Sequence, residues 1–467
     1  MPRGTLREAG LFMTASLPSS SSTALTLTGG GESIPSMPSE PTSRSFFEEL
    51  QWRGLVSDAT PGVNAALENE KAVAYIGFDP TASSLHVGSL VPIMGLARLQ
   101  RFGHSPIALV GGGTGLIGDP SGKKTERSLL NAEQVEANLQ GIKRQLSRFL
   151  DFDHGGNAAR MLNNADWLTT IPLTDFLRDV GKHFKVNAML NRESVRRRLE
   201  SEEGISFTEF SYMLLQAYDF LVLHQRYGCT LQMGGSDQWG NILAGTDLIG
   251  RVTDGKAHGI VFPLVTSSSG EKFGKTEAGT IWLDPERTSP YNFYQFWLRT
   301  DDRDVVKYLK FFTWLGPEEI GELEARVRTA PEAREGQRRL AEEMTRIVHG
   351  EEALGNAQRI SRLFFGEDVA SLSADEVLQV VDEAPSTDLP AAELAAGILL
   401  PDLLLRAGLA SSKGEARRFI ESGGIYLSNK PVTDPRRAIG LADGIEGKLL
   451  LLRKGKSNYH VVRIVPS

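Results

Sequence analysis

The stretch that decides the fold is Phe78-Asp79-Pro80-Thr81-Ala82-Ser83-Ser84-Leu85-His86-Val87-Gly88-Ser89-Leu90. It follows an apolar run, Ala72–Ile76, that predicts a buried parallel strand, and it precedes residues 91–102, which predict a helix. A strand, a polar turn and a helix opening form one half of a βαβ unit. The turn would bring His86, Val87 and Gly88 to a helix start, whose unpaired N–H groups attract phosphate.

Two residues of this turn suit nucleotide chemistry. Gly88 has no side chain, so a flat ligand such as an adenine ring would approach the backbone closely. His86 would donate a hydrogen bond to an oxygen that carries developing charge. The alternative is a capped helix start with a satisfied histidine, and for a lone His-x-Gly this alternative is favoured. The rest of the chain decides between the two.

The turn resembles the His-Ile-Gly-His signature of class I aminoacyl-tRNA synthetases, here His86-Val87-Gly88-Ser89. The second signature of that class, Lys-Met-Ser-Lys-Ser, is similar to Lys272-Phe273-Gly274-Lys275-Thr276. Ser89 departs from the pattern, because the family usually has His or Asn there. This departure puts the contact to the ATP ribose from that position in doubt, but not the class.

Three further stretches resemble bacterial tyrosyl-tRNA synthetases. They are residues 75–81 (YIGFDPT), residues 212–219 (YMLLQAYD) and residues 232–241 (QMGGSDQWGN). The resemblance runs from about residue 46 to the C-terminus. It implies an α/β fold, with a Rossmann-like nucleotide-binding catalytic domain on a parallel sheet. A helical domain and a small α+β S4-like RNA-binding domain would follow.

The length and composition agree with a chain of several domains. The 467 residues exceed one ordinary core, so two to four domains are expected. The single cysteine, Cys229, rules out an internal disulfide and a cysteine-based zinc site, and no stretch is long and apolar enough to span a membrane. The net charge is −7, but residues 401–467 hold twelve Lys+Arg and six Asp+Glu, which leaves −13 for the rest. A basic tail on an acidic body indicates one module that meets phosphate.

The expected domains follow in chain order. The Ser-, Thr-, Pro- and Gly-rich residues 1–45 predict a disordered extension, for which we favour a start codon placed too early over a transit peptide. The catalytic domain is expected at residues 46–285, with an insertion and dimer region at about 125–205. A helical anticodon-side domain is expected at 286–365, a linker at 366–398 and the S4-like domain at 399–467.

Within the insertion, residues 131–150 predict an amphipathic helix, and residues 166–180 repeat helical spacing. The basic run at residues 192–198 is either a solvated face or a contact to the tRNA acceptor stem.

A glycine-rich run follows the strand predicted at residues 106–110. It contains Gly113-x-Gly115-x-x-Gly118, the dinucleotide-binding pattern, but a dehydrogenase would continue with a helix, a strand and an acidic residue. Here a polar, basic loop follows instead. By resemblance, this loop supplies Asp119 to the tyrosine ammonium group and places Lys123 and Arg127 near the pyrophosphate.

Residues 208–223 predict a helix with three polar side chains on one face, which is either half-exposed or the wall of a pocket. The resemblance implies the wall of a tyrosine pocket. The tyrosine-binding set that it implies is Tyr75, Asp119, Tyr212, Gln216, Asp219 and Gln238. Of these, Asp219 and Tyr75 are assigned to the phenol, and Tyr212, Gln216 and Asp119 to the ammonium group.

Amino-acid activation joins a carboxylate to the α-phosphate of ATP, so positioning and charge stabilisation would carry the catalysis. The implied catalytic residues are His86, Thr81, Lys123, Arg127, Lys272 and Lys275, the two last on a loop, residues 267–280, expected to close on ATP. The implied ATP-binding residues are Gly77, Asp79, His86, Gly88, Gly235, Asp237, Lys272, Lys275 and Thr276. ATP is expected as a substrate, with Mg²⁺ held by its phosphates; no protein metal site and no tightly bound cofactor are expected.

The expected partners are L-tyrosine, ATP, tRNA(Tyr) and a second copy of the chain, in a cytoplasmic enzyme with no membrane. Lys413, Arg417 and Arg418 are the implied RNA contacts, on a helix that opens at Ser412. Two rivals remain: a tryptophanyl-tRNA synthetase, which shares fold and signatures, and an RNA-binding protein that kept the fold but lost catalysis. Tyr75, the residue 212–219 helix and the S4-like module speak against the first, and the lysines of both loops against the second.

Overall fold

The computed structural model describes residues 44–118, 132–200, 204–268, 270, 273–276, 279–365, 374, 385–455 and 458–466. The predictions for residues 1–43 and for the basic loop at 119–131 lie outside these residues. No helix in the described part of the chain is both long and apolar enough to cross a membrane.

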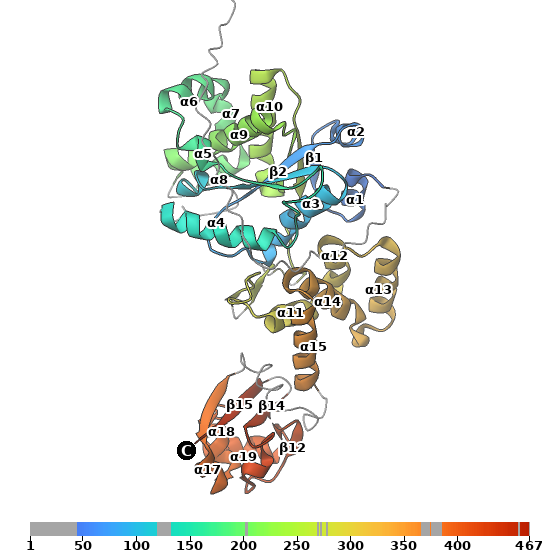
Figure 1. Cartoon of the computed structure of the whole chain (residues 1–467), viewed down its shortest axis with the longest axis vertical. Helices are drawn as coiled ribbons and strands as arrows, with labels where there is room; N and C mark the ends of the chain where they lie inside the picture. Colours follow the sequence, from blue (N-terminus) through green and yellow to red (C-terminus); the bar gives the residue numbers. More distant parts are fainter. Residues whose placement is uncertain are drawn as a thin grey trace, which may run out of the picture. The chain divides into compact units, whose positions relative to one another are not determined.

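A six-stranded sheet, counted over the described residues, forms the centre of the first domain (Figure 1). Its strands are β1 (Asp58–Ala59), β2 (Val73–Phe78), β3 (Ser105–Val110), β4 (Arg160–Asn163), β5 (Leu231–Gly235) and β6 (His258–Phe262), in the order β1-β6-β5-β2-β3-β4. All neighbours are parallel except β1, which runs antiparallel to β6. The order reverses between β2 and β5, and such a switch point is where open α/β sheets bind ligands.

Two cores cover the two faces of the sheet, because successive side chains of a strand point to opposite sides. On β2, Ala74, Ile76 and Phe78 pack in the core that includes α3 (Leu90–Arg101) and α4 (Ala132–Leu146). Tyr75 faces the other core, with α9 (Phe207–Tyr227) and α10 (Trp239–Thr253). The predicted strand, turn and helix of the opening stretch are therefore β2, the 3₁₀ turn η1 (Val87–Ser89) and α3.

The insertion between β3 and β5 departs from the prediction in one element. The helical spacing of residues 166–180 does not give one helix, but α5 (Ala165–Leu168) and α6 (Leu173–Asp179). Pro172 lies between them; it lacks an N–H group, and its ring disfavours helical backbone at Ile171. Two short helices, α7 (Val186–Leu190) and α8 (Glu193–Leu199), complete the region.

Between the sheet and residue 365, the described residues form five α-helices: α11 (Pro290–Leu298), α12 (Asp302–Phe312), α13 (Pro317–Thr329), α14 (Glu335–His349) and α15 (Glu351–Phe365). Their apolar faces belong to the same core as α3 and α1 (Phe46–Trp52). Arg53, at the end of α1, and Arg98 of α3 both donate to the carbonyl of Thr313, which follows the C-terminus of α12. Guanidinium groups suit that end, where carbonyls lack partners and the helix dipole is negative.

The C-terminal module contains a five-stranded sheet within the described residues, in the order β12-β11-β14-β15-β9. Its strands are β9 (Ser386–Pro390), β11 (Ile425–Leu427), β12 (Lys430–Val432), β14 (Leu449–Lys454) and β15 (Asn458–Val465). The smaller elements are α17 (Ala391–Ala395), β10 (Ile398–Leu399), α18 (Leu400–Arg406), α19 (Lys413–Glu421) and β13 (Ala438–Ile439).

The module starts earlier than the sequence indicated. Residues up to 398 were expected to be a linker, but β9 pairs in parallel with β15, and Leu389 is buried in the core of the module. The partner strand, β15, lies about 70 residues further along the chain, so the local sequence around β9 does not predict the pairing.

Candidate active site

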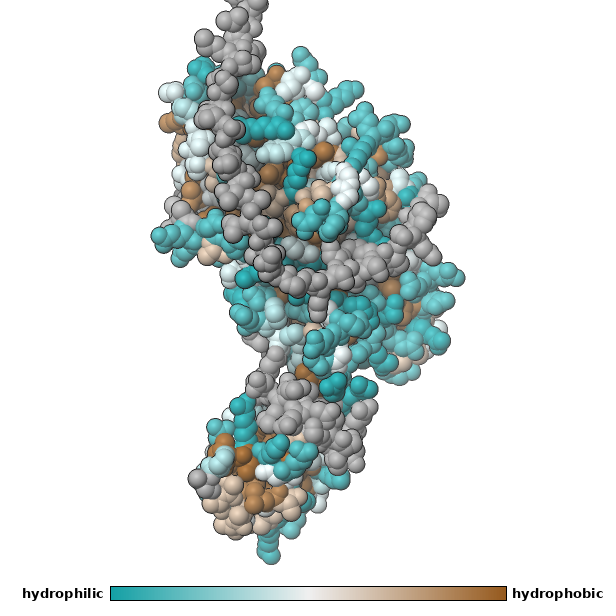
Figure 2. Space-filling model, in the orientation of Figure 1, coloured by the Kyte–Doolittle hydropathy of each residue, from teal (hydrophilic) through white to brown (hydrophobic). Residues whose placement is uncertain are grey.

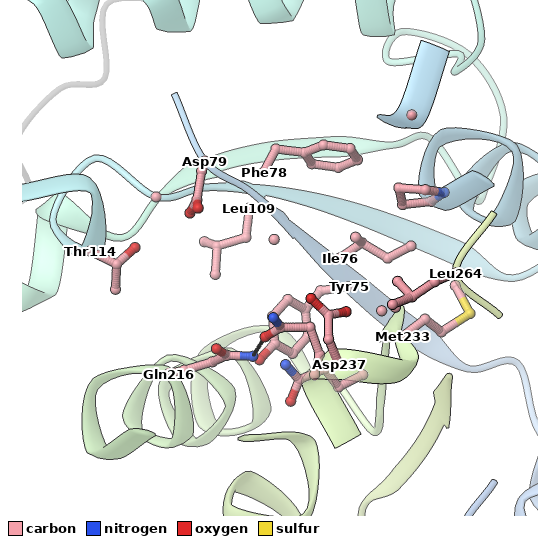
Figure 3. A pocket seen from close by; sticks show the side chains of 18 of the residues that line it. Tyr75, Ile76, Phe78, Asp79, Leu109, Thr114, Gln216, Met233, Asp237 and Leu264 are labelled. Atoms are coloured by element: carbon pink, nitrogen blue, oxygen red, sulfur yellow. Dashed lines mark hydrogen bonds between the residues drawn. The ribbon is translucent and has the colours of Figure 1, made fainter. Parts of the chain in front are cut away.

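A pocket of about 710 Å³ opens at the carboxyl ends of β2 and β5, at the switch point of the sheet (Figure 3). This volume lies within the range of small-molecule sites. The predicted residues that line it are Tyr75, Gly77, Asp79, His86, Gly88, Tyr212, Gln216, Asp219, Gly235, Asp237 and Gln238. The fold thus gathers residues from four separate stretches of sequence.

Other predicted residues are not placed there. Thr81 is exposed and does not belong to the pocket wall. Asp119, Lys123, Arg127 and Lys272 lie outside the described residues, as do the side chains of Lys275 and Thr276, whose backbone forms β7 (Lys275–Thr276) paired with β8 (Gly279–Thr280).

The deep end of the pocket holds a buried carboxylate. Asp219 is 2 % exposed; its Oδ1 accepts from Nε1 of Trp167 at 2.7 Å, and its Oδ2 accepts from Nδ2 of Asn164 at 2.9 Å. Burial raises the pKa of Asp219 to about 7, against these two hydrogen bonds, which lower it. The carboxylate is therefore held in place and stands near the midpoint of its titration at neutral pH.

Asn164 was not predicted as a site residue. It stands at the N-cap position of α5, where an asparagine usually caps the helix, but its side chain makes no cap bond. Instead Oδ1 accepts from the Gly113 N–H at 2.8 Å, and Nδ2 also donates to Oγ1 of Thr114 at 2.9 Å. Asn164 thus joins the glycine-rich run to Asp219.

Close packing beside Asn164 accounts for the glycine at position 112 of the glycine-rich run. A Cβ atom at Gly112 would lie 2.2 Å from Oδ1 of Asn163, closer than atoms approach. Gly112 therefore allows close packing against the side chain of Asn163 at the end of β4.

Tyr75 lies beside the carboxylate. Its ring packs edge-on against Phe220 at 5.3 Å, and its hydroxyl is buried without a hydrogen-bond partner in the described part of the protein. Burial and then the charge of Asp219 raise the pKa of Tyr75 well above its usual value, so the hydroxyl keeps its proton. Oε1 of Gln232, which lines the same pocket, is also buried and unpaired among described atoms. Buried polar groups need partners, and a ligand hydroxyl would supply them.

A polar network lines the pocket nearer its middle. Nε2 of Gln216 donates to Oε1 of Gln238 at 3.3 Å, and Nδ2 of Asn241 donates to the side-chain oxygens of both, at 3.0 and 3.1 Å. Figure 3 shows Gln216 and Asp237 in the lower part of the view and Asp79 in the upper part. Asn241 is a second residue that the sequence did not single out, although it ends one of the quoted stretches.

His86 both caps the turn and lines the pocket. Its Nδ1 accepts from the Gly88 N–H at 3.0 Å, which is the capped start foreseen as the alternative. Because Nδ1 accepts this bond, the neutral imidazole carries its proton on Nε2. The cap thus fixes the tautomer of the neutral ring.

The residues of the two predicted signatures meet in space. The Ile281 N–H donates to the carbonyl of Gly274, and the Val87 N–H donates to the carbonyl of Ile281, both at 3.0 Å. The loop that carries Lys275 therefore lies against the turn that carries His86.

The predicted RNA-binding residues lie on α19 of the C-terminal module. Lys413, Arg417 and Arg418 are all exposed, and Nζ of Lys413 is 2.5 Å from Oδ1 of Asp402. The helix opens as predicted, with Oγ of Ser412 accepting from the Glu415 N–H.

Comparison with known proteins agrees with this geometry. A family model described as "tRNA synthetases class I (W and Y)" matches residues 67–366, and one for the tyrosine–tRNA ligase SYY-like C-terminal domain matches residues 376–462. Fold, pocket and signatures define an aminoacyl-tRNA synthetase of class I. The second match begins before β9, in line with the earlier start of the module.

Individual relatives indicate which family of class I synthetases the chain resembles. A tyrosine–tRNA ligase of Roseiflexus castenholzii is 57 % identical over 90 % of this chain and its own full length, and one of Geobacillus kaustophilus is 53 % identical over 90 % of this chain and 99 % of its own length. A C-terminally truncated mitochondrial tyrosyl-tRNA synthetase of Aspergillus nidulans covers 69 % of this chain and 94 % of its own, with 32 % identity and a TM-score of 0.63. The chain belongs to the tyrosine–tRNA ligase family.

Proposed function

We propose that this chain joins L-tyrosine to tRNA(Tyr) in two steps. Tyrosine first reacts with ATP to give tyrosyl-adenylate and pyrophosphate, and the tyrosyl group then passes to the 3′-terminal ribose of the tRNA. The observation that carries the choice of amino acid is the deep end of the pocket, where the Tyr75 hydroxyl and the Asp219 carboxylate lie buried together.

The phenol of tyrosine fits that end because it both donates and accepts a hydrogen bond. It would donate to the Asp219 carboxylate and accept from Tyr75. Phenylalanine would leave the buried Tyr75 hydroxyl unpaired and would give Asp219 no bond beyond those from Trp167 and Asn164. An unpaired buried polar group rejects such an analogue strongly. The ammonium group would lie nearer Tyr212, Gln216 and Asp119, with Gln238 and Asn241 orienting Gln216.

Activation needs no covalent protein intermediate. The α-phosphate of ATP gains negative charge as the tyrosine carboxylate attacks it, so donors fixed in advance lower the barrier. The Nε2 proton of His86 is such a donor, and Lys123, Arg127, Lys272 and Lys275 would add positive charge. Gly77, Gly88, Gly235, Asp79, Asp237 and Thr276 would surround the nucleotide, while Thr81, outside the pocket wall, would act through the turn.

Magnesium would enter with ATP. The ion keeps several waters and binds phosphate oxygens together with one or two carboxylates. The described residues hold no cluster of three or more metal-ligating side chains, and Asp79 and Asp237 are the carboxylates that line the pocket beside Asp219. The ion would neutralise charge on the phosphates as pyrophosphate leaves.

The tRNA would meet the C-terminal module. Its net charge of +6 at residues 401–467, on a chain of net charge −7, attracts a phosphate backbone. Arg417 and Arg418 are exposed on α19 and would contact it, with Lys413 after exchange of its Asp402 partner.

We also propose a homodimer through the insertion, in an enzyme that works in the cytoplasm. Large apolar side chains are exposed there, among them Leu173 at 71 %, together with Leu177, Val186, Leu190 and Leu199; Phe207, at the adjoining start of α9, is 78 % exposed. Most of the surface visible in Figure 2 is hydrophilic, with smaller apolar areas among it. Large apolar side chains that are exposed in a contiguous patch typically mark a protein interface.

The deciding experiment is ATP–pyrophosphate exchange with tyrosine, tryptophan and phenylalanine in turn. Exchange that depends on tyrosine alone is expected. Exchange that depends on tryptophan would identify a tryptophanyl-tRNA synthetase instead. The absence of exchange with all three amino acids would identify an RNA-binding protein that kept the synthetase fold but lost catalysis.

A further inference from the structure

Phe273, between the two lysines of the second signature, lies in an aromatic box. Its ring centroid is 5.8 Å from those of Phe296 and Trp297 on α11, and 5.1 and 5.5 Å from those of Tyr308 and Phe312 on α12. It stacks on Phe312 with only 8° between the ring planes. Edge-on and stacked ring pairs add to the stability gained from burial alone.

The next residue, Gly274, rests directly on the first signature. Its φ of +79° belongs to the left-handed region, which glycine adopts without strain. A Cβ atom there would lie 2.5 Å from Cγ2 of Val87. Phe273 and Gly274 are therefore fixed on two sides, by the helices α11 and α12 and by the turn that carries His86.

Helix α12 also holds the segment that leads into this loop. Oδ2 of Asp304 accepts from the Ser268 N–H at 2.7 Å, and Nζ of Lys307 donates to the carbonyl of Thr266 at 3.3 Å. The same helix thus fixes the backbone before the lysines and the ring between them.

We propose that Phe273 is a positioning residue for the activation step: the aromatic box fixes the backbone of the segment that carries Lys275, the residue to which the proposed function assigns a charge at the ATP phosphates. A lysine is a point charge on a flexible stem, so its effect depends on where its backbone is held. A misplacement of about 1 Å costs up to about 100-fold in rate. This inference rests on the proposed role of Lys275 and adds to it the group that sets its place.

The test is a double-mutant cycle of Phe273→Ala and Lys275→Ala, with the single-turnover rate of tyrosyl-adenylate formation as the readout. Phe273→Ala is expected to lower that rate by about 10- to 100-fold while the Kd for tyrosine stays unchanged. In the Lys275→Ala background, the same change is expected to have little further effect, because residues that act as a unit are not additive.

Two results would overturn the inference. Losses that multiply would show that Phe273 acts on its own, for instance by touching ATP at the pocket wall, and an unchanged rate in Phe273→Ala would show that the box is not needed. Tyrosine-dependent exchange by the unmodified enzyme is measured alongside, so a failure of the proposed function is seen separately.

Two further variants separate positioning from folding. Phe273→Met fills the box with a flexible apolar side chain and is expected to restore most of the rate. Phe293→Leu is the matched control: that ring is fully buried in the same core, where it packs against Trp297 and His349. It is expected to lower Tm comparably and to leave activation intact; a loss of activation equal to that of Phe273→Ala would reduce the box to a folding element.

Discussion

Trp167 donates its indole N–H to Oδ1 of Asp219 over 2.7 Å, across 52 positions of sequence. The bond links α5, in the insertion, to α9, the long helix behind the sheet. Together with the bond from Asn164, it orients a carboxylate that burial would otherwise drive to its neutral form. If Asp219 binds the phenol as proposed, discrimination of tyrosine would depend on a carboxylate whose pKa of about 7 lies close to neutral pH.

The first prediction concerns pH. Above a pKa of about 7 Asp219 is ionised, and a carboxylate accepts the phenol hydrogen more strongly than a carboxylic acid does. The ratio of kcat/KM for tyrosine to that for phenylalanine should therefore rise between pH 6 and pH 8. Trp167→Phe removes a bond that lowers this pKa, so the midpoint of the rise should move to higher pH. A ratio that is flat with pH in the unmodified enzyme would contradict the assignment of Asp219 to the phenol.

The second prediction concerns the two groups at the phenol. Tyr75→Phe should weaken activation of tyrosine by about 0.5–1.5 kcal/mol, the contribution of one neutral hydrogen bond. Asp219→Ala should cost more, and both changes should affect phenylalanine less, because it has no hydroxyl to lose. The measurement is kcat/KM for both amino acids in each variant. Equal losses for the two substrates would assign Tyr75 and Asp219 to the fold alone.

The third prediction concerns charge at the phosphates. Lys275→Ala should slow single-turnover formation of tyrosyl-adenylate by about 100- to 1,000-fold, as expected for one charge-stabilising donor. Tyrosine binding should barely change, because the deep end of the pocket is untouched. Equilibrium binding of tyrosine serves as the control, and a normal activation rate would exclude Lys275 from the chemistry.

The fourth prediction concerns the C-terminal module, which begins at β9. Removal of residues 385–467 should leave tyrosine-dependent pyrophosphate exchange nearly intact and abolish most tRNA charging. A truncation that began at residue 395 would keep β9 but remove its partner strand, β15. In the full-length enzyme, the affinity for tRNA should fall steeply with salt, and Arg417→Ala with Arg418→Ala should flatten that slope. Normal tRNA charging by the truncated enzyme would show that the module has a function other than tRNA binding.

The fifth prediction concerns the exposed apolar side chains of the insertion and of Phe207, at the start of α9. Leu173→Asp combined with Phe207→Asp should convert a dimer into a monomer in sedimentation equilibrium, because both charges would be buried at the interface. Leu441→Asp is the matched control, since Leu441 is an exposed leucine of the C-terminal module. A dimer that survives the double change would place the interface elsewhere.

The sequence by itself determined the strand, turn and helix at residues 72–102, the presence of both signatures, and the polar face of α9. These features are local: hydrophobic period, turn chemistry and helical spacing act over a few residues, so they can be read without a fold. The resemblance to class I synthetases, rather than the local pattern, assigned His86, Gly88, Tyr212, Gln216 and Asp219 to a ligand site, and all five line one pocket in the fold. The roles assigned to them stay predictions.

Only the tertiary structure decided which groups support those residues. The sequence analysis singled out neither Asn164 nor Trp167, yet both donate hydrogen bonds to Asp219. Phe273 lies in the predicted loop at residues 267–280, yet its ring packs against four aromatic rings. The pairing of β9 with β15 and the contact of Gly274 with Val87 are likewise visible only in the tertiary structure. Each joins segments far apart in the chain, and because such a contact depends on the packing of everything between them, neither segment carries a local sign of it.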